Sequence, residues 1–521
     1  MERVAPPQVN YDNVLPLAIE SRSNRREFLP VNGQRFSNDG GSTIVRIDVN
    51  ADSMLDATHS YLECNIRNDA AAPAAGTNFL ALNGLGPSWI QRLRIESGGV
   101  VIEDINEYSR LYAMLVLNQC PKEYVKNNLA LMGMYQEHKS SSLNIAAGGF
   151  TFDLVSNGAT TAAAGASSTP AVSDLHYNMS SRGILGGVLS TTNNGIGEVV
   201  VPTDEGLTGV HRSTRLGAAQ SLNMCIPLVS GFLNMDKYVP LVMMNAGFTI
   251  ELTLCDANRI GVTQTEGSAA GNNNSTFVAS NWSVSGVKYV AHLIDLDRSF
   301  YDSLRMVMES SGGVLQLAGQ SYRHFSGSLP AGAGEATITL PARVKSIKSI
   351  FGTFINSVQV GGTGTYDTPV FQTGGISGFR FEIGSVRYPQ TDVDCGTYLN
   401  ASHRNPLSGS QREAELEKAF GKIGDYQHQK AYSAINTCNV SVARSGTNFR
   451  NSTLSAFTIG YDFEAFQRVA LEAGINTADR SLPINCIITR AQSATLMRAD
   501  FYVLVDAIFF INLDGTASVS Y

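Results

Sequence analysis

Short runs in which apolar and polar residues alternate recur along this chain of 521 residues, and they constrain its fold more than any other feature. A period of two residues places successive side chains on opposite faces of a β-strand. Glycine and asparagine separate the runs, which is typical of turns between packed strands. The runs therefore predict an all-β chain built of sandwiches or barrels. The clearest examples are residues 43–49, 61–66, 89–95, 248–254, 336–340, 379–383 and 485–489.

Helical periodicity is confined to a few segments, and two of these occupy matching places in the two halves of the chain. The first helix is expected to begin near Asp104, because Asp104 and Glu107 resemble a capping box before an apolar face. The second is expected to begin at Ser410, with Glu413 three residues later. Each helix follows a pair of strands. The order strands, helix, strands therefore occurs twice.

This repeated order divides the chain near its midpoint, at residues 296–315. We predict a first domain over residues 39–300 and a second over residues 301–521. The segment before them, residues 1–38, is predicted to be an N-terminal arm. The length is thus accounted for by two enlarged β domains rather than by three domains of ordinary size.

Charged residues make up only 16% of the chain, against ~25% in an ordinary soluble protein. Either much of the surface is neutral and polar, or much of it is covered by other subunits. The net charge is −7, whereas nucleic-acid-binding domains usually have a pI above ~9. A DNA-coating role is therefore disfavoured, and no specific nucleic-acid binding is expected. One dense basic cluster is either a solvated segment or a contact for an acidic partner: Arg22, Arg25 and Arg26.

Neither a signal peptide nor a transmembrane segment is predicted. Residues 1–7 lack the apolar core of a signal peptide. The longest apolar stretches, 241–253 and 501–513, are shorter than the ~18 residues that a spanning helix needs. Seven cysteines are scattered along the chain without a CxxC pair, which favours buried free thiols in a reducing compartment.

Motifs for catalysis or cofactor binding are missing from the sequence, which contains no GxxxxGK[ST], HExxH, GxSxG or HxH pattern. The glycine pairs within residues 84–86 and 362–364 lack the strand–turn–helix context of a dinucleotide fingerprint, and they are interpreted as turn residues. We therefore predict no catalytic residues, no cofactor-binding residues and no cofactor, in a protein that is not an enzyme.

Isolated titratable residues are given structural roles as well. His292 lies within a predicted strand and is interpreted as a structural residue rather than a metal ligand, so no metal-binding residues are predicted. The neighbouring acidic residues Glu103 and Asp104, and likewise Asp392 and Asp394, are interpreted as turn or cap residues. Proximity in sequence does not set the ~5–9.5 Å separation that a pair of catalytic carboxylates needs.

Three segments resemble a known family, the double jelly-roll major capsid proteins of tailless double-stranded DNA viruses. They are residues 225–234 (CIPLVSGFLN), 238–242 (YVPLV) and 248–254 (FTIELTL), which are similar to the run that closes the first jelly roll of that family. Residues 287–298 resemble the strand and connector between its two rolls. The family includes adenoviruses, the large nucleocytoplasmic DNA viruses, virophages and polinton-like viruses. The length of this chain is most similar to the virophage and polinton-like members.

The resemblance implies two tandem eight-stranded jelly-roll sandwiches, each with one or two short helices and long loops. It implies a homotrimer that forms a pseudo-hexameric capsomer, and capsomers that tile an icosahedral virion shell enclosing a double-stranded DNA genome. The expected partners are the chain itself, neighbouring capsomers, and penton and minor or cement proteins. The N-terminal arm would supply inner contacts, and the expected location is the virion.

Two other classes of function stay open at this stage. A carbohydrate-binding β-sandwich protein would need clustered surface aromatics, and the chain has only two tryptophans, Trp89 and Trp282. A metal-dependent jelly-roll enzyme would need ligands that the missing HxH pattern does not provide. Two long loops rich in small residues, 159–173 and 266–276, are either receptor contacts or ordinary variable loops.

Overall fold

The computed structural model describes most of the strands and helices and leaves gaps between them. The described residues are 20–38, 41–69, 78–82, 86–120, 142–146, 149–153, 215–216, Ala219, 221–235, 237–256, 261–265, 276–279, 281–357, Phe371, 374–395, 409–421, 457–465, 473–478, 483–490 and 496–521. The loops at 70–77, 159–173 and 361–368 lie outside these residues, as does the loop at 266–276 except for Thr276.

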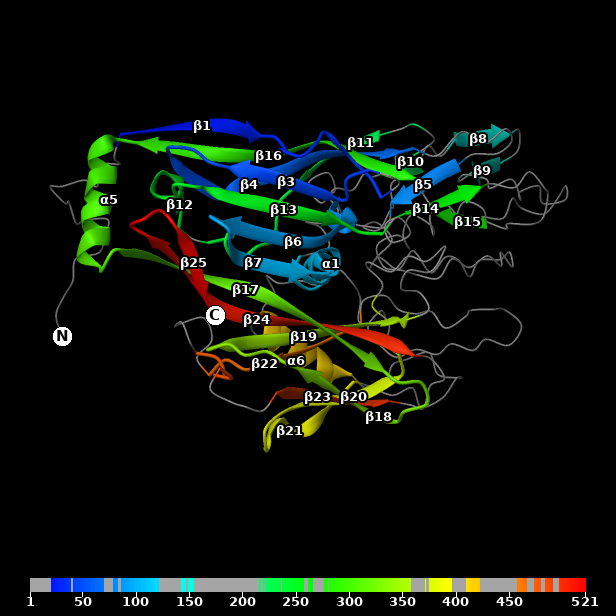
Figure 1. Cartoon of the computed structure of the whole chain (residues 1–521). Helices are drawn as coiled ribbons and strands as arrows, with labels where there is room; N and C mark the ends of the chain where they lie inside the picture. The colour runs from blue at the N-terminus through cyan, green and yellow to red at the C-terminus, as the bar shows by residue number, and fades with distance from the viewer. Residues whose placement is uncertain are drawn as a thin grey trace, which may run out of the picture.

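The first half of the chain forms a sandwich of two antiparallel sheets (Figure 1). Eight strands in chain order make it: β1 (Ser21–Phe28), β3 (Ile44–Val49), β4 (Met54–Asn68), β6 (Ile90–Ser97), β7 (Val100–Asn106), β11 (Ser221–Ile226), β13 (Phe248–Leu254) and β16 (Trp282–Leu296). The sheet orders are β1-β16-β4-β11 and β3-β13-β6-β7. Short strands β2 (Arg35–Phe36) and β12 (Val239–Pro240) extend the first sheet.

The second half repeats this arrangement with another eight strands. They are β17 (Val314–Leu329), β18 (Glu335–Leu340), β19 (Ile347–Asn356), β20 (Ile376–Ile383), β21 (Val386–Asp394), β22 (Thr458–Asp462), β23 (Ile484–Arg490) and β24 (Met497–Asn512). The sheet orders are β17-β24-β19-β22 and β18-β23-β20-β21, and β25 (Ala517–Ser520) adds to β24.

The strand order of both sandwiches is that of a jelly roll. If the eight strands of either half are numbered along the chain, one sheet reads 1-8-3-6 and the other 2-7-4-5. This pairing of first with last strand, and of second with seventh, is the double Greek key of a jelly roll. The predicted fold class, two tandem eight-stranded jelly rolls, is confirmed.

Two smaller sheets lie at the end of the first sandwich, at the right-hand side of Figure 1. One contains β10 (Arg215–Leu216), β5 (Asn78–Leu82), β14 (Gly261–Thr265) and β15 (Thr276–Ala279), in that order. The other is the hairpin of β8 (Ser142–Ala146) and β9 (Gly149–Asp153). These strands come from the long connections within the first sandwich. The end that carries them is opposite to the end where α5 (Arg298–Ser310) lies.

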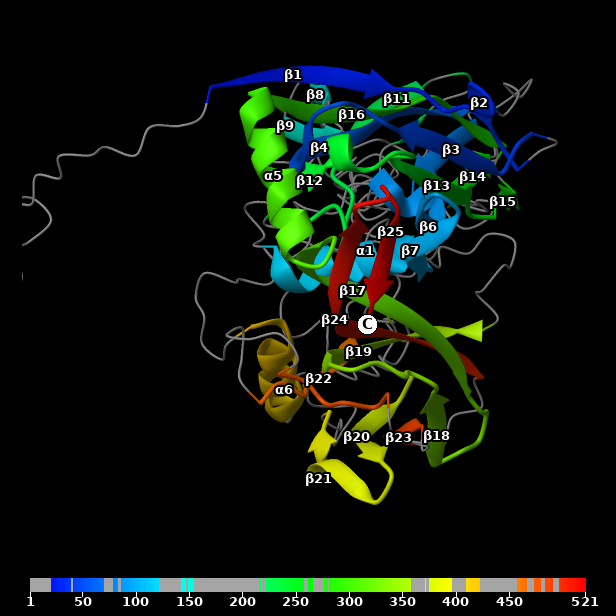
Figure 2. The same ribbon diagram turned by 60° about the vertical axis from the view of Figure 1, so that its left-hand side comes forward.

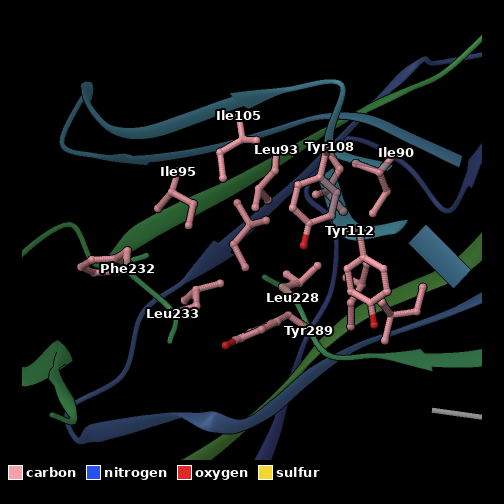
Figure 3. Close-up of a cluster of buried hydrophobic side chains, with 14 of the residues drawn as sticks. Ile90, Leu93, Ile95, Ile105, Tyr108, Tyr112, Leu228, Phe232, Leu233 and Tyr289 are labelled. Atoms are coloured by element: carbon pink, nitrogen blue, oxygen red, sulfur yellow. The ribbon is translucent and has the colours of Figure 1, made fainter. Parts of the chain in front are cut away.

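Alternation along the strands explains where the two cores form. Along β13 every second residue is fully buried, and β18 shows the same alternation against an exposed face. In the first sandwich, β6 contributes Ile90, Leu93 and Ile95 to a cluster that also holds Tyr108 and Tyr112 (Figure 3). The second sandwich has its own core, which joins residues of both of its sheets.

The helices α1 (Tyr108–Gln119) and α6 (Ser410–Phe420) lie between the fifth and sixth strands of their respective sandwiches, so the predicted matching places are correct. The second helix begins at Ser410 as expected. The expected start of the first near Asp104 is wrong, because β7 runs on to Asn106 and no side chain caps α1. The cross-strand pairing of Asp104 with Arg94, together with the burial of Ile105, keeps this segment in the sheet.

Three long elements do not follow from the sequence patterns: β1, α5 and β17. The predicted N-terminal arm covers residues 1–38, but residues 21–28 pair with β16 along their whole length and form an edge strand of the first sheet. Only Phe28 of β1 and only Met308 of α5 are buried, so neither is a core element. The helix α5 joins the last strand of the first sandwich to the first strand of the second.

Short 3-10 turns precede β6 and follow β12, at η2 (Gly86–Trp89) and η4 (Leu241–Met243). Within the part of the chain that the structure describes, no helix is both long enough and apolar enough to cross a bilayer.

Candidate functional site at the junction of the two sandwiches

The two sandwiches meet where α1 and β7 of the first face β17, β24 and β25 of the second (Figures 1 and 2). The apolar core of the first sandwich continues across this contact to Leu317 and Phe509 of the second, yet the contact also contains several charged and polar side chains that are almost completely buried. Buried polar groups must find partners inside the protein, since an unpaired group costs free energy. We define this set of contacts as the junction.

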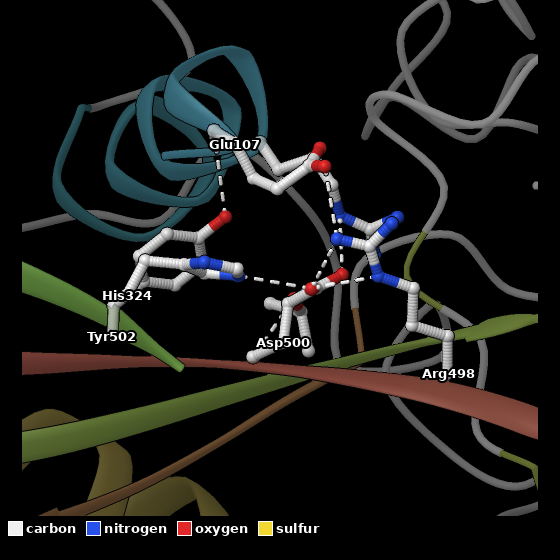
Figure 4. A network of polar contacts seen from close by, with 7 residues as sticks. Glu107, His324, Arg498, Asp500 and Tyr502 are labelled. Carbon is white, nitrogen blue, oxygen red and sulfur yellow. Dashed lines mark hydrogen bonds and ion pairs between the residues drawn. The ribbon is translucent and has the colours of Figure 1, made fainter. Parts of the chain in front are cut away.

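Asp500 on β24 is at the centre of the junction and is fully buried (Figure 4). Its carboxylate lies 3.3 Å from the Nε of Arg110 on α1, 3.0 Å from the Nε2 of His324 on β17, and 2.9 Å from the Nε of Arg498. Burial alone would raise the pKa of Asp500, but the Arg110 charge, the His324 hydrogen bond and the Arg498 charge outweigh it and hold that pKa well below its usual range. The carboxylate is therefore ionised at neutral pH, and it links both sandwiches.

Glu107, at the start of α1, supplies two further links to β24. Its carboxylate accepts a hydrogen bond from the Nη2 of Arg498 at 2.9 Å, and its carbonyl oxygen accepts one from the hydroxyl of Tyr502, also at 2.9 Å (Figure 4). Glu107 has a positive φ of 50°, a conformation that is uncommon for a residue with a side chain. The sharp turn from β7 into α1 thus coincides with the attachment of the second sandwich.

Glu103 on β7 forms a second buried centre. Its carboxylate accepts hydrogen bonds from the hydroxyls of Ser230 and Ser321 and, at 2.8 Å, from the backbone N–H of Gly231. Ser321 belongs to β17, so this group also spans the two sandwiches. Burial raises the pKa of Glu103 despite these hydrogen bonds.

Tyr521 closes the junction beside β25. Its hydroxyl donates to the carbonyl oxygen of Ile102 at 2.6 Å, and the guanidinium of Arg323 lies 4.1 Å from the centre of its ring. Hydrogen bonds and cation–π contacts depend on distance and angle. Taken together, the junction contacts favour one relative orientation of the two sandwiches over neighbouring ones.

The acidic pairs singled out in the sequence do not form dyads. Glu103 is buried in the junction, whereas Asp104 points to the other face of β7 and pairs with the Nε of Arg92 at 2.7 Å. Asp392 pairs with Arg380 at 3.0 Å, and the backbone N–H of Asp394 donates to Gln411. All but Glu103 therefore make local contacts, but they do so from within strands β7 and β21 and not from the turns or caps that we expected.

The remaining singled-out residues are also placed. His292 lies on β16, on the face opposite the core. Trp89 and Trp282 are both buried. Arg22, Arg25 and Arg26 lie on the exposed strand β1.

Of the turn glycines, Gly86 begins η2, and residues 84, 85 and 362–364 lie outside the described part of the chain. Among the described residues no group of three or more His, Cys, Asp or Glu side chains is placed to hold a metal ion.

The junction residues themselves were missed by sequence reasoning. Arg110, His324 and Asp500 come from distant positions, and nothing in their local patterns indicates that they meet. One signal was available: Asp500 is a charged residue within the long apolar strand β24, where a charge must be paired.

Comparison with known proteins identifies the fold. No protein-family model matches the chain, and no curated protein matches it in sequence. Solved structures do match over nearly its whole length. VP54 of PBCV-1, in a crystal structure fitted into a cryo-EM reconstruction of the virophage Sputnik, has a TM-score of 0.52 at 9% identity and covers 98% of this chain and 99% of its own.

Two further structures agree. The faustovirus major capsid protein has a TM-score of 0.52 at 10% identity, covering 97% of this chain and 92% of its own. A chain of the cryo-EM structure of the Sputnik virophage has a TM-score of 0.50 at 13% identity, covering 100% and 93%. At such identities the likeness establishes the fold: the chain is a double jelly roll of the kind found in capsid proteins of large DNA viruses and virophages.

Proposed function

We propose that this chain is a structural, non-enzymatic major capsid protein that forms homotrimers, each a pseudo-hexameric capsomer of an icosahedral virion shell around a double-stranded DNA genome. The observation that carries this proposal is the tandem pair of jelly rolls with one shared strand order, joined by the buried junction. The full-length likeness to viral capsid structures supports it.

Each chain has two lobes, one per sandwich, so three chains around a threefold axis place six lobes in one capsomer. Closed cyclic symmetry is the usual way in which identical chains associate. Three chains supply six sandwiches of the same topology, and six similar lobes in a ring pack into a hexagonal array. That outcome requires both sandwiches of each chain to keep one fixed orientation, which is the property that the junction contacts favour.

The low proportion of charged residues is consistent with this assembly. Obligate interfaces bury about 2,000–5,000 Å² or more and are depleted in charge at their centres. A chain with only 16% charged residues can cover much of its surface with neighbours at little desolvation cost. Neighbouring capsomers, penton proteins and minor or cement proteins are the partners that we propose, with the virion as the location.

The proposed division into domains needs one change at its beginning. We propose that the first domain starts at β1, near residue 21, instead of at residue 39, and that the two domains divide within α5, near residue 300. Residues 1–19 lie outside the described part of the chain, and an inner contact made by them stays a proposal.

Native mass spectrometry of the purified full-length chain tests the proposed oligomer. Three chains of 55.9 kDa give an expected mass of about 168 kDa. A stable species of one chain, in buffers that permit assembly, contradicts the proposal. A carbohydrate-binding protein is less well supported, because Trp89 and Trp282 are both buried and provide no surface platform for a sugar ring.

A further inference from the structure

The outer face of the first sandwich carries a pair of histidines that no part of the proposed function uses. His59 on β4 and His292 on β16 have ring centres 6.0 Å apart, with the ring planes inclined at 53°. Both lie on the β1-β16-β4-β11 sheet, which is the outermost layer on the side away from the second sandwich (Figure 1). The His59 side chain is 74% exposed.

An irregularity in the sheet brings the two rings together. Asp56 is opposite His292, and Tyr61 is opposite Val290, so residues 57–60 of β4 lie across from Ala291 alone. Such bulges redirect a side chain, are treated as designed features rather than defects, and occur next to functional sites. Here the bulge turns His59 toward His292.

Hydrogen bonds from Ser60 hold the bulge in place. The Ser60 hydroxyl donates to the carbonyl oxygen of Asp56 at 2.7 Å and accepts from the backbone N–H of His292 at 3.0 Å. The backbone that carries one ring is thereby tied to the backbone that carries the other. The fold therefore keeps the backbone segments of His59 and His292 close together before any ligand arrives.

Asp56 sets the orientation and tautomer of His59. Its side chain is only 6% exposed, and its carboxylate lies 2.7 Å from the Nδ1 of His59. An ionised carboxylate accepts only, so Nδ1 carries the proton and the Nε2 of the neutral ring keeps a free lone pair. A carboxylate behind a histidine in this way is the usual arrangement at metal-ligating histidines.

We propose that His59 and His292 form a binding site for a divalent late first-row metal ion, for which Zn²⁺ is the probe, with Asp56 as the residue that positions His59. Imidazole nitrogens suit such ions, and water can fill the remaining coordination positions. Two imidazoles on one Zn²⁺ at ~2.0–2.1 Å place their ring centres about 5–6 Å apart, which the observed 6.0 Å nearly meets.

The surrounding charges do not oppose a cation. Arg25 is opposite His292 on β1, and Lys288 lies further along β16 on the same face. Arg25 pairs with Glu27 at 3.1 Å, and Lys288 pairs with Glu27 at 3.1 Å and with Glu63 at 3.2 Å. Both cations beside the histidines are thus matched by carboxylates. The proposal does not depend on the proposed capsid role.

Zn²⁺ titration of the full-length chain by calorimetry, after treatment with a chelator, tests the site. We expect one Zn²⁺ per chain to be bound by the unaltered protein and to be lost in His59→Ala and in His292→Ala. Asp56→Asn is expected to weaken binding about 10–100-fold, the usual effect of removing such a positioning group. His428→Ala, which removes a histidine elsewhere in the sequence, is the matched control and should bind as the unaltered protein does.

Two results would overturn the proposal. One is Zn²⁺ uptake that is the same in the unaltered protein and in a His59→Ala, His292→Ala double variant, since the ion would then be held by other side chains. The other is no uptake by the unaltered protein. A thermal melt of each variant, with one cooperative transition as in the unaltered protein, confirms that it is folded.

Discussion

At the scale of single residues, Asp500 is the most constrained position in the molecule. It is a buried anion in contact with three potential cations from three segments: Arg110, His324 and Arg498. The free energy of such a cluster depends on every partner being present. If one charge is removed, the others are left buried without compensation.

Replacement of Asp500 by asparagine tests this dependence. We expect the Asp500→Asn variant to lose about 3–5 kcal/mol of unfolding free energy, as observed when one partner of a buried ion pair is removed. The exposed pair of Arg46 and Asp48, 3.8 Å apart, gives the matched control. Asp48→Asn should cost less than about 1 kcal/mol. Equal losses in the two variants, measured by denaturant unfolding, would show that the junction contributes no more than a surface pair.

The two buried carboxylates of the junction should respond to acid in opposite ways. The pKa of Asp500 is lowered in the folded state, so its ionised form stabilises the fold at pH values above the ordinary aspartate pKa of ~3.9. This stabilisation is lost only as the pH falls below ~3.9. The pKa of Glu103 is raised, so its ionised form costs stability at neutral pH, and that cost disappears as pH falls toward ~4.3.

The variant Glu103→Gln isolates the second effect. At neutral pH we expect it to melt at the same temperature as the unaltered protein or at a higher one. As pH falls from neutrality toward ~4.3, the unaltered protein should gain stability relative to the variant. Thermal melts across this pH range measure the difference. A relative loss by the unaltered protein on acidification contradicts the sign that we assign to Glu103.

At the scale of elements, the turn around Gly231 is pressed against β17. A Cβ atom at Gly231 would lie 2.1 Å from the carbonyl oxygen of Gln320, which is a backbone atom and cannot rotate away. The same turn supplies the N–H that binds Glu103. A glycine is therefore required for the two sandwiches to approach as closely as they do.

Gly231→Ala is expected to destabilise the protein by about 1–3 kcal/mol, the usual cost of overpacking. Gly334→Ala is the matched control, because a Cβ there meets only the carbonyl oxygen of Arg490 at 3.9 Å. Differential scanning calorimetry compares the two variants. If Gly334→Ala lowers the melting temperature as much as Gly231→Ala does, the close approach to β17 is not the cause.

Strand alternation also predicts which thiols react. Cys64 on β4 and Cys225 on β11 belong to neighbouring strands, but Cys64 is buried and Cys225 is half-exposed on the outer face. Burial raises the pKa of Cys64 to about 12. Under native conditions we expect iodoacetamide to label Cys225 well before Cys64, as read by peptide mass spectrometry. Equal labelling would mean that the sheet does not protect Cys64.

Sequence patterns predict elements well where one face is buried and poorly where none is. The strand at residues 248–254 was expected over the range that β13 occupies, because each of its alternate residues enters the core. In contrast, β1 buries a single residue, so the hydrophobic effect leaves no periodic trace in it. The first helix was placed too early, because a strand alternation through Ile105 overrides the capping-box pattern.

At the scale of the whole molecule, the sequence predicts the architecture but does not predict the junction. The repeated order of strands and helix indicated two similar halves, and resemblance to capsid proteins named the topology. The junction brings together residues as far apart as Arg110 and Asp500, and such long-range contacts depend on how the sandwiches dock. No local pattern encodes that docking.

The fixed pairing of the two sandwiches gives the molecule a shape suited to one kind of assembly. Each chain presents two lobes of the same topology in a single orientation, and a threefold axis arranges three such chains into six lobes. Loss of the junction, as in Asp500→Asn, should therefore impair regular assembly as well as stability.

Electron microscopy of the purified full-length protein tests the capsid proposal most directly. The proposal predicts particles of three chains, about 168 kDa in all, with six lobes in a pseudo-hexagonal outline. Uniform two-lobed particles of a single 55.9 kDa chain, under conditions that permit assembly, would contradict it.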